Sequence, residues 1–126
     1  MSEALLGRIG QIAITVEDTE RATAFYRDVL GLRHLFSAPP NLAFFDCGGI
    51  RLMLAPPEDA VKSAASVLYF PVADIAAAHA ELAGRGAAFE GPPHVVHRAP
   101  GYELWMAFFR DSEKNLHALM CEKKQS

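Results

Sequence analysis

The sequence predicts an α+β protein made of two tandem repeats of a βαβββ module. A strand-like segment, an aspartate cap, an amphipathic helix and a glycine stop occur in this order twice. Asp74 in the second copy lies 56 residues after Asp18 in the first. Ala78 lies the same distance after Ala22. A constant offset across several elements is the pattern expected of an internal repeat.

The first copy opens with a strand and a helix. Residues 9–16 read IGQIAITV, and their alternation puts Ile12, Ile14 and Val16 on one face. Asp18 or Thr19 then caps a helix, and Gly31 ends it. The residues at helical spacing, which we expect to form its buried stripe, are Ala22, Phe25, Tyr26, Val29 and Leu30.

Each copy closes with a hairpin. Residues 42–54 read as a strand, a Gly-Gly turn and a strand, and residues 104–120 read as a strand, a polar turn and a strand. A further strand is expected before each hairpin, near residues 33–37 and 88–90.

The resulting division of the chain places the first module at residues 6–55 and the second at residues 65–122. Residues 56–64 are predicted to link them. Residues 123–126 form a polar tail.

Composition narrows the class of protein. The 126 residues are 51% hydrophobic and 21% charged with a net charge of −3, which predicts a packed core and no nucleic-acid surface. No apolar run approaches the roughly 20 residues that span a bilayer. The two cysteines form no CxxC pair and no signal peptide is evident, so a cytoplasmic location is expected.

Two segments resemble the vicinal oxygen chelate family, which includes glyoxalases, bleomycin-resistance proteins and extradiol dioxygenases. Residues 16–32 resemble its strand-to-helix opening, and residues 108–116, FFRDSEKNL, resemble its closing FxDPDGN hairpin. Ser112 and Lys114 replace the usual proline and glycine. Lys114 therefore occupies a turn position that favours a positive φ, where a lysine is strained.

The resemblance implies an architecture and a mode of association. The eight strands would form two incompletely closed half-barrels with the helices outside. Members that use a metal place four ligands inside, one from the first and one from the last strand of each module. Two-module chains of the family commonly form homodimers, so a homodimer is expected.

The resemblance also locates the four metal-ligand positions in this chain. They are Gln11, Met53, Val67 and Ala118. A divalent metal needs oxygen or imidazole ligands, so Gln11 is the only surviving candidate ligand. The standard metal site is predicted to be absent, and no cofactor is predicted.

A displaced metal site is the alternative. A register slip of one residue in the last strand would bring His117 into the cavity, although it would also invert that strand. A site rebuilt from His94, His97 and His117, with Glu103 nearby in sequence, is a further alternative. The opposing interpretation treats His94 and His97 as exposed or hydrogen-bonding residues on a strand and loop.

An apolar cavity with a few polar groups predicts a small-molecule site. Arg51 is suited to a carboxylate or phosphate. His97 and Glu103 are the candidates for a base and its orienting partner, and core packing with a surface ion pair is the competing interpretation. The residues predicted to bind ligand are Gln11, Arg51, Met53, Val67, Tyr69, Trp105 and Ala118.

Two function classes follow. The first is a glyoxalase/bleomycin-resistance-like protein that has lost the standard metal site and holds an apolar or zwitterionic small molecule. The second is a lyase, isomerase or dioxygenase of the same family that uses a displaced metal or a metal-free acid–base pair. Neither class involves a nucleic acid or a membrane.

Overall fold

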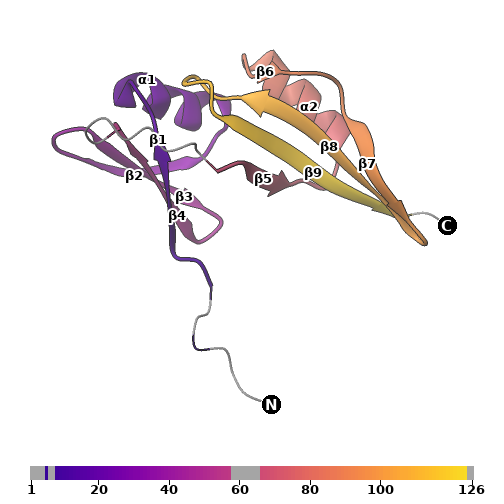
Figure 1. The fold of residues 1–126 in the computed structure, drawn as a ribbon. Coiled ribbons are helices and arrows are strands. Elements are labelled where there is room, and N and C mark those ends of the chain that lie inside the picture. The colour runs from indigo at the N-terminus through magenta and orange to yellow at the C-terminus, as the bar shows by residue number, and fades with distance from the viewer. Residues whose placement is uncertain (1–4, 6–7, 58–65, 125–126) are drawn as a thin grey trace.

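A computed structural model describes residue 5, residues 8–57 and residues 66–124 (Figure 1). Two mixed β-sheets lie side by side, and both helices lie along one side of them. Neither sheet closes into a barrel, which confirms the α+β class and the tandem half-barrel arrangement. Most of the predicted linker lies outside the described residues.

The first module forms a four-stranded sheet in the order β1-β4-β3-β2. The first strand pairs in parallel with the last, and the remaining pairs are antiparallel. Its elements are β1 (Gln11–Thr15), α1 (Thr19–Ala24), the π-helical turn η1 (Phe25–Val29), β2 (Arg33–Ala38), β3 (Leu42–Cys47) and β4 (Ile50–Ala55).

The second module repeats this plan with one additional strand. Its elements are β5 (Leu68–Pro71), α2 (Ile75–Gly84), β6 (Ala88–Phe89), β7 (His94–Ala99), β8 (Tyr102–Arg110) and β9 (Leu116–Lys124). Both β6 and β7 pair with β8, because Pro92 and Pro93 interrupt what is one strand in the first module. The described strands therefore number nine rather than the predicted eight.

The end of the chain also differs from its prediction. Strand β9 continues through Lys123 and Lys124, two residues into the segment predicted as a polar tail. Lys123 pairs with Glu103 across the sheet, and its ammonium lies 3.9 Å from the centre of the Trp105 ring. This cation–π contact stabilises the extension of β9 beyond its predicted end.

The two helices begin in the same way. The side chain of Asp18 accepts a hydrogen bond from the backbone of Arg21, and that of Asp74 accepts one from Ala77. Both aspartates have the extended backbone of an N-cap. The two caps, 56 residues apart, therefore make equivalent hydrogen bonds, as the predicted repeat requires.

Each module has its own core, located between its sheet and its helix. In the first, Ile14 and Leu52 of the sheet pack with Ala22 and Tyr26 of the helical segment. In the second, Ile75 of α2 packs with residues of β8 and β9. Leu30, at the end of the first helical segment, packs against both cores. The faces of the sheets that contact the helices are therefore the buried ones.

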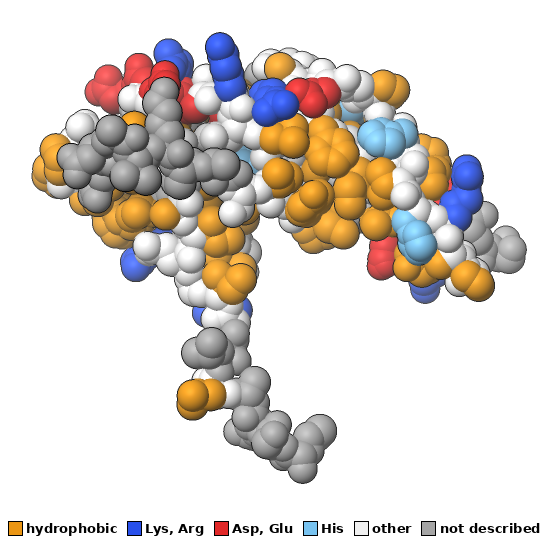
Figure 2. All heavy atoms as spheres, in the orientation of Figure 1, with side chains coloured by type: hydrophobic (Ala, Val, Ile, Leu, Met, Phe, Trp, Pro, Cys, Tyr) orange, Lys and Arg blue, Asp and Glu red, His pale blue; other side chains and the backbone are white. Residues whose placement is uncertain are grey.

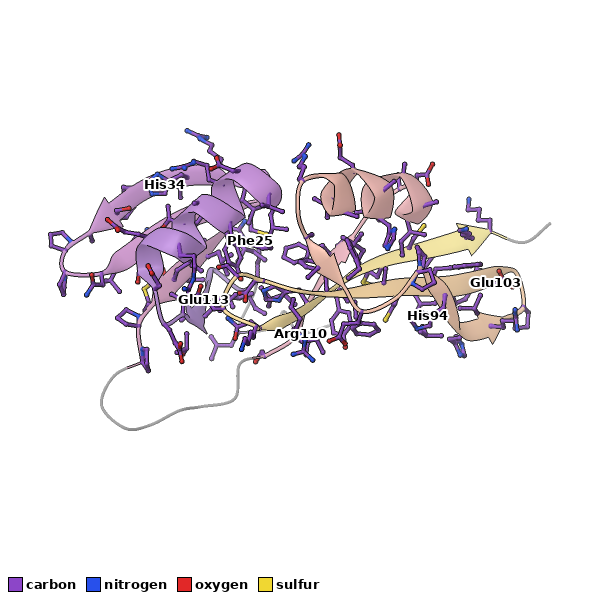
Figure 3. The ribbon with its side chains drawn as sticks, turned by 90° about the horizontal axis from the view of Figure 1, so that it is seen from above. Phe25, His34, His94, Glu103, Arg110 and Glu113 are labelled. Carbon is purple, nitrogen blue, oxygen red and sulfur yellow. The ribbon has the colours of Figure 1, made fainter. Side chains whose placement is uncertain are left out.

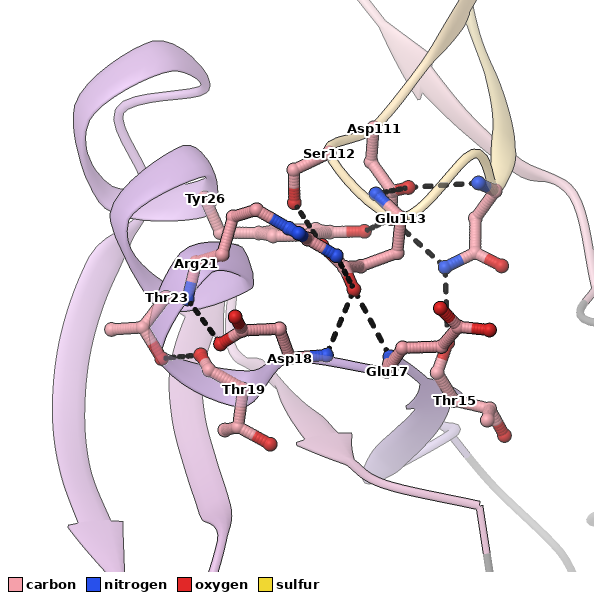
Figure 4. Close-up of polar contacts among 11 residues, drawn as sticks. Thr15, Glu17, Asp18, Thr19, Arg21, Thr23, Tyr26, Asp111, Ser112 and Glu113 are labelled. Carbon is pink, nitrogen blue, oxygen red and sulfur yellow. Dashed lines mark hydrogen bonds and ion pairs between the residues drawn. The ribbon is translucent and has the colours of Figure 1, made fainter.

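The turn between β8 and β9 joins the two modules (Figure 4). The Glu113 carboxylate accepts hydrogen bonds from the backbone N–H groups of Glu17 and Asp18, at 3.0 and 2.9 Å. It also pairs with the Arg21 guanidinium at 2.7 Å, and its side chain is 1% exposed. A carboxylate of the second module thus satisfies free N–H groups at the start of the first module's helix.

A second set of contacts between the modules involves Tyr26, Asp111 and His117. Tyr26 donates its hydroxyl proton to Asp111 at 2.6 Å, and the nitrogen Nε2 of His117 lies 2.8 Å from the same hydroxyl oxygen. Because that proton is already given to the carboxylate, His117 must donate from Nε2. Its other nitrogen is buried and has no partner among the described residues. Asn115 adds a further contact between the modules by donating to the backbone oxygen of Thr15. We call these contacts of Glu113, Asp111, His117 and Asn115 with the first module the joint.

Replacing Glu113 should therefore loosen the joint between the modules. In Glu113→Gln the charge that pairs with Arg21 is lost while the side chain keeps its size. We expect the free energy of unfolding in urea to fall by about 1.5–3 kcal/mol, the range for hydrogen bonds to a charged group. Glu20→Gln, an exposed change in the first turn of α1, is the matched control and should alter it little. Equal effects of the two changes would contradict this role.

The same joint should make the protein sensitive to acid. The hydrogen bond from Arg21 lowers the pKa of Glu113 to about 2. Burial raises the pKa of Asp111, but contacts with His117, Tyr26 and Asn115 outweigh it and bring the value to about 2.

A carboxyl group whose pKa is depressed on folding contributes stability above its unfolded pKa of about 4, and this is lost as the pH falls toward the folded value. We expect the free energy of unfolding to fall between about pH 4 and pH 2. Urea titrations at several pH values measure it. The fall should be shallower in Glu113→Gln, and an unchanged slope would contradict the assignment.

Lys114 has the strained backbone predicted for it, with a φ of +69°. Its two turn contacts use backbone atoms, which a glycine retains. Relief of a strain of about 1–2 kcal/mol, less the greater freedom of glycine in the unfolded chain, should make Lys114→Gly more stable by about 0.5–1 kcal/mol. Lys114→Ala keeps the Cβ atom and should give no such gain in thermal unfolding.

Candidate functional site

The face of each sheet that points away from the helices carries most of the predicted site residues. Side chains alternate along a strand, so the neighbours of the buried core residues lie on this helix-free face. Ile12 and Ile14 of β1 pack toward the helix, which leaves Gln11 on the helix-free face. Leu52 and Leu54 of β4 are buried, which leaves Arg51 and Met53 beside Gln11.

A row of contacts crosses the first sheet on this face. The Arg51 Nε donates to the Gln11 Oε1 at 2.8 Å, and the Gln11 amide nitrogen lies 3.9 Å from the sulfur of Met53. The Arg51 guanidinium carbon lies 5.3 Å from the centre of the Phe44 ring. The Phe36 ring stacks on the Phe44 ring, with their centres 4.5 Å apart. The structure therefore places a cation beside an aromatic pair.

The corresponding face of the second sheet is more apolar. Tyr69 lies opposite Ala118, which in turn lies opposite Phe108 on β8. The rings of Tyr69 and Phe108 are 6.4 Å apart in an edge-to-face arrangement, and Ala118 is fully buried. Val67 immediately precedes β5. Figure 2 shows hydrophobic side chains gathered over the second sheet, with histidines beside them.

The register supports the assignment of equivalent positions in the two modules. Ala13 pairs with Met53 in the first sheet, and Tyr69 pairs with Ala118 in the second. Tyr69 lies 56 residues after Ala13, the same offset as between the helix caps. Met53 and Ala118 therefore occupy matching places on the last strands of their modules.

Trp105 lies on the opposite face of the second sheet. It packs beside the core that contacts α2, so it is not beside Tyr69 and Ala118. Alternation along β8 puts Trp105 and Glu103 on the same face, and the structure places this pair on the helix side.

The structure does not bring His97 and Glu103 together. His97 pairs with Leu104, whose side chain points away from the helix side, and so lies on the helix-free face. Glu103 accepts hydrogen bonds from Arg98 at 2.8 Å and from Trp105 at 3.1 Å. The bond from Arg98 lowers the pKa of Glu103. Its carboxylate is thus an ion-pair partner of Arg98 rather than the orienting partner of His97.

The three histidines of the second module do not form a cluster. His94 and His97 lie on β7, with the His94 ring 6.2 Å from that of Phe108. His117 is buried on the helix side in the joint with Tyr26. In Figure 3 His94 and Glu103 lie toward the far end of the second sheet, while Glu113 lies beside α1. In the described part of the chain, no three His, Cys, Asp or Glu side chains are placed to hold a metal ion.

Two clefts occur elsewhere and contain none of the predicted site residues. One, of about 710 Å³, lies between the start of α1 and the turn from β2 to β3. The other, of about 290 Å³, is mainly apolar and lies between the modules on the helix side, with Glu81 and Arg85 among its lining residues. The predicted site is instead an open face in a single chain.

Phe36 and Phe44 belong to this face and were missed by sequence reasoning. Phe44 alternates with the buried Ala43 and Phe45, and this is the signal that could have placed it. Phe36 follows a bulge between His34 and Phe36, which shifts its face and is not visible in the sequence. Within the described residues, no helix is both long and apolar enough to cross a membrane.

Comparison with known proteins gives a consistent result. A family model described as the Glyoxalase/Bleomycin resistance protein/Dioxygenase superfamily matches residues 8–119. A comparison with curated proteins gave no significant match.

Several solved structures share the fold. A superfamily member from Sphaerobacter thermophilus is 23% identical, with a TM-score of 0.76 over 94% of this chain and 99% of that one. TnmS3, an antibiotic-binding protein from Streptomyces, is 22% identical, with a TM-score of 0.74 over 94% and 98%. A lactoylglutathione lyase from Agrobacterium tumefaciens is 24% identical, with a TM-score of 0.72 over 92% and 94%.

Proposed function

The chain belongs to the glyoxalase/bleomycin resistance protein/dioxygenase superfamily, and we propose that it binds a small molecule without a metal. The ligand would lie on the helix-free faces of the sheets. The fold shared with an antibiotic-binding protein is compatible with a binding role. The fold alone does not select binding over catalysis, so the proposal depends on the chemistry of the site.

One observation carries the proposal. The amide oxygen of Gln11, the only candidate metal ligand left by the sequence, accepts a hydrogen bond from the Arg51 guanidinium at 2.8 Å. A guanidinium stays protonated at all ordinary pH values. A divalent cation bound to the same oxygen would meet a positive charge at close range. The positive charge beside Gln11 therefore favours an anion over a metal ion at this position.

The remaining donor set also fits a metal poorly. Met53 offers a soft thioether, and Val67 and Ala118 offer no donor atom. Ala118 lies opposite both Tyr69 and Phe108 and is fully buried. These residues do not fit the divalent ion that metal-dependent relatives use.

The enzyme alternative gains no comparable support. A metal-free acid–base pair of His97 and Glu103 needs the two side chains within hydrogen-bond reach. They lie on opposite faces of the second sheet, and Glu103 is held by Arg98.

We also propose that two copies pair through the helix-free faces, in the cytoplasm. Phe36 is 46% exposed and Tyr69 is 47% exposed on these faces. Large apolar side chains exposed on an open sheet commonly mark an interface. A partner covering them would convert an open face into an enclosed site.

The binding proposal is tested on the full-length protein purified without chelators. Elemental analysis should find far less than one transition metal per chain, and added Zn²⁺, Ni²⁺ or Mn²⁺ should not raise the melting temperature. A panel of small aromatic molecules should contain some that do raise it, because a ligand at 100 times its dissociation constant stabilises by about 2.7 kcal/mol. One tightly bound metal ion per chain, or turnover of a ligand, would contradict the proposal.

Pairing is tested by light scattering after size exclusion. We expect the mass of a dimer for the natural chain and of a monomer for Tyr69→Glu, because a charge would be buried in the interface. Ala76→Glu, an exposed change on α2, is the control and should remain dimeric. A monomeric natural chain at micromolar concentration would contradict pairing.

A further inference from the structure

We propose that the ligand of the helix-free face is a planar aromatic carboxylate, whose anionic group is bound by Arg51 and whose ring lies against Phe36, the exposed end of the stack on Phe44. This inference rests on the proposed binding function and adds to it the chemical class of the ligand. It follows from contacts that cross the first sheet and from the charges around them.

The contacts form a continuous row with one residue from each strand of the sheet. In the sheet order β1-β4-β3-β2, the row contains Gln11, Arg51, Phe44 and Phe36. Polar groups stand at one end of the row and aromatic rings at the other. A ligand that matches it needs an anionic end and a flat apolar body.

Arg51 is prepared to bind an anion. Gln11 accepts from the Nε, and among the described residues the two terminal nitrogens make no other hydrogen bond, so they remain available for the two oxygens of a carboxylate. Five other arginines, in contrast, form ion pairs with carboxylates of the chain: Arg21, Arg27, Arg85, Arg98 and Arg110. Among the described residues, no carboxylate lies within 4.0 Å of the Arg51 guanidinium.

The one acidic residue opposite Arg51 is otherwise engaged. Asp46 pairs with Arg51 across the strands, but its carboxylate accepts the backbone N–H of Gly49 at 3.1 Å. Arg33 lies on the other side of Asp46, in register with it. The end of the face that holds Arg51 thus carries two guanidinium groups and one carboxylate, which leaves it positive overall.

The aromatic end of the row offers an exposed ring on which a flat ligand can pack. Phe44 is 8% exposed, with the Arg51 guanidinium over its ring and the Phe36 ring stacked on it. Phe36, which ends the stack, is 46% exposed. A flat ring gains more from such a surface than an alkyl chain of equal size, since its face and edge match those of the phenylalanine. Arg51, held over Phe44, would keep the carboxylate beside this surface.

The test compares two probes of the same shape, 2-naphthoate and the neutral 2-naphthamide, by isothermal titration calorimetry on the full-length protein. We expect naphthoate to bind about 10–100-fold more tightly, the factor for a charge-assisted hydrogen bond. This preference should weaken as salt is raised, because the guanidinium is exposed.

The variants separate charge from shape. Arg51→Met should reduce naphthoate affinity to that of naphthamide and leave naphthamide binding unchanged. Arg51→Lys should restore part of the preference, since it keeps the charge without the fork. Phe36→Leu should weaken both probes. Arg98→Met, which removes an exposed arginine from the other face of the second sheet, is the control and should change neither.

The outcomes distinguish this inference from the function on which it rests. Equal binding of both probes, unaffected by Arg51→Met, would overturn the anionic ligand class and leave metal-free binding in place. Failure of naphthoate to bind at millimolar concentration would overturn the inference as well. Naphthoate binding that requires an added divalent metal would overturn both.

Discussion

The carboxylate of Glu113 is the contact on which the relation of the two modules depends. It comes from the last turn of the second module and accepts the free backbone N–H groups that start the first module's helix. The pairing with Arg21 fixes its direction. Because helix starts carry unsatisfied donors and a partial positive charge, one buried anion there orders a helix and a turn together. Each module has a separate core, so the relation of the sheets depends on this polar joint, on Leu30 and Leu68, and on the hydrogen bond from Arg85 to the backbone oxygen of Val29.

The position of the joint decides which faces remain open. It lies on the helix side, where Tyr26, Asp111 and His117 are buried together. All of the strongest inter-module contacts are therefore made away from the helix-free faces. Those faces keep their exposed aromatic side chains because nothing within the described chain is needed there to hold the modules together. Under the proposed function, the inter-module contacts and the binding surface lie on opposite sides of the same sheets.

Patterns that act locally could be predicted, and contacts between distant segments could not. The helix caps Asp18 and Asp74, the strained Lys114 and the shared face of Gln11, Arg51 and Met53 follow from spacing and alternation. The face of Trp105 depends on which side of the sheet α2 packs, and alternation alone does not specify it. The contact of Glu113 with a helix about 95 residues away has no local signal. A bulge before Phe36 likewise hides it from a strict period of two.

The proposed loss of the metal-ligand set would have a further physical consequence. A metal ion supplies positive charge at the centre of a cavity, and Met53 and Ala118 cannot hold one. Arg51 supplies a positive charge from the chain itself, at the oxygen of Gln11 where a metal would be bound. A guanidinium attracts the same anionic groups, but it offers hydrogen-bond donors in a plane instead of open coordination positions. It can orient an anion, yet it lacks the orbitals to polarise a bound oxygen as a Lewis acid does. Under the proposed function, this exchange would retain recognition of a negative ligand while removing the chemistry that a metal would perform on it.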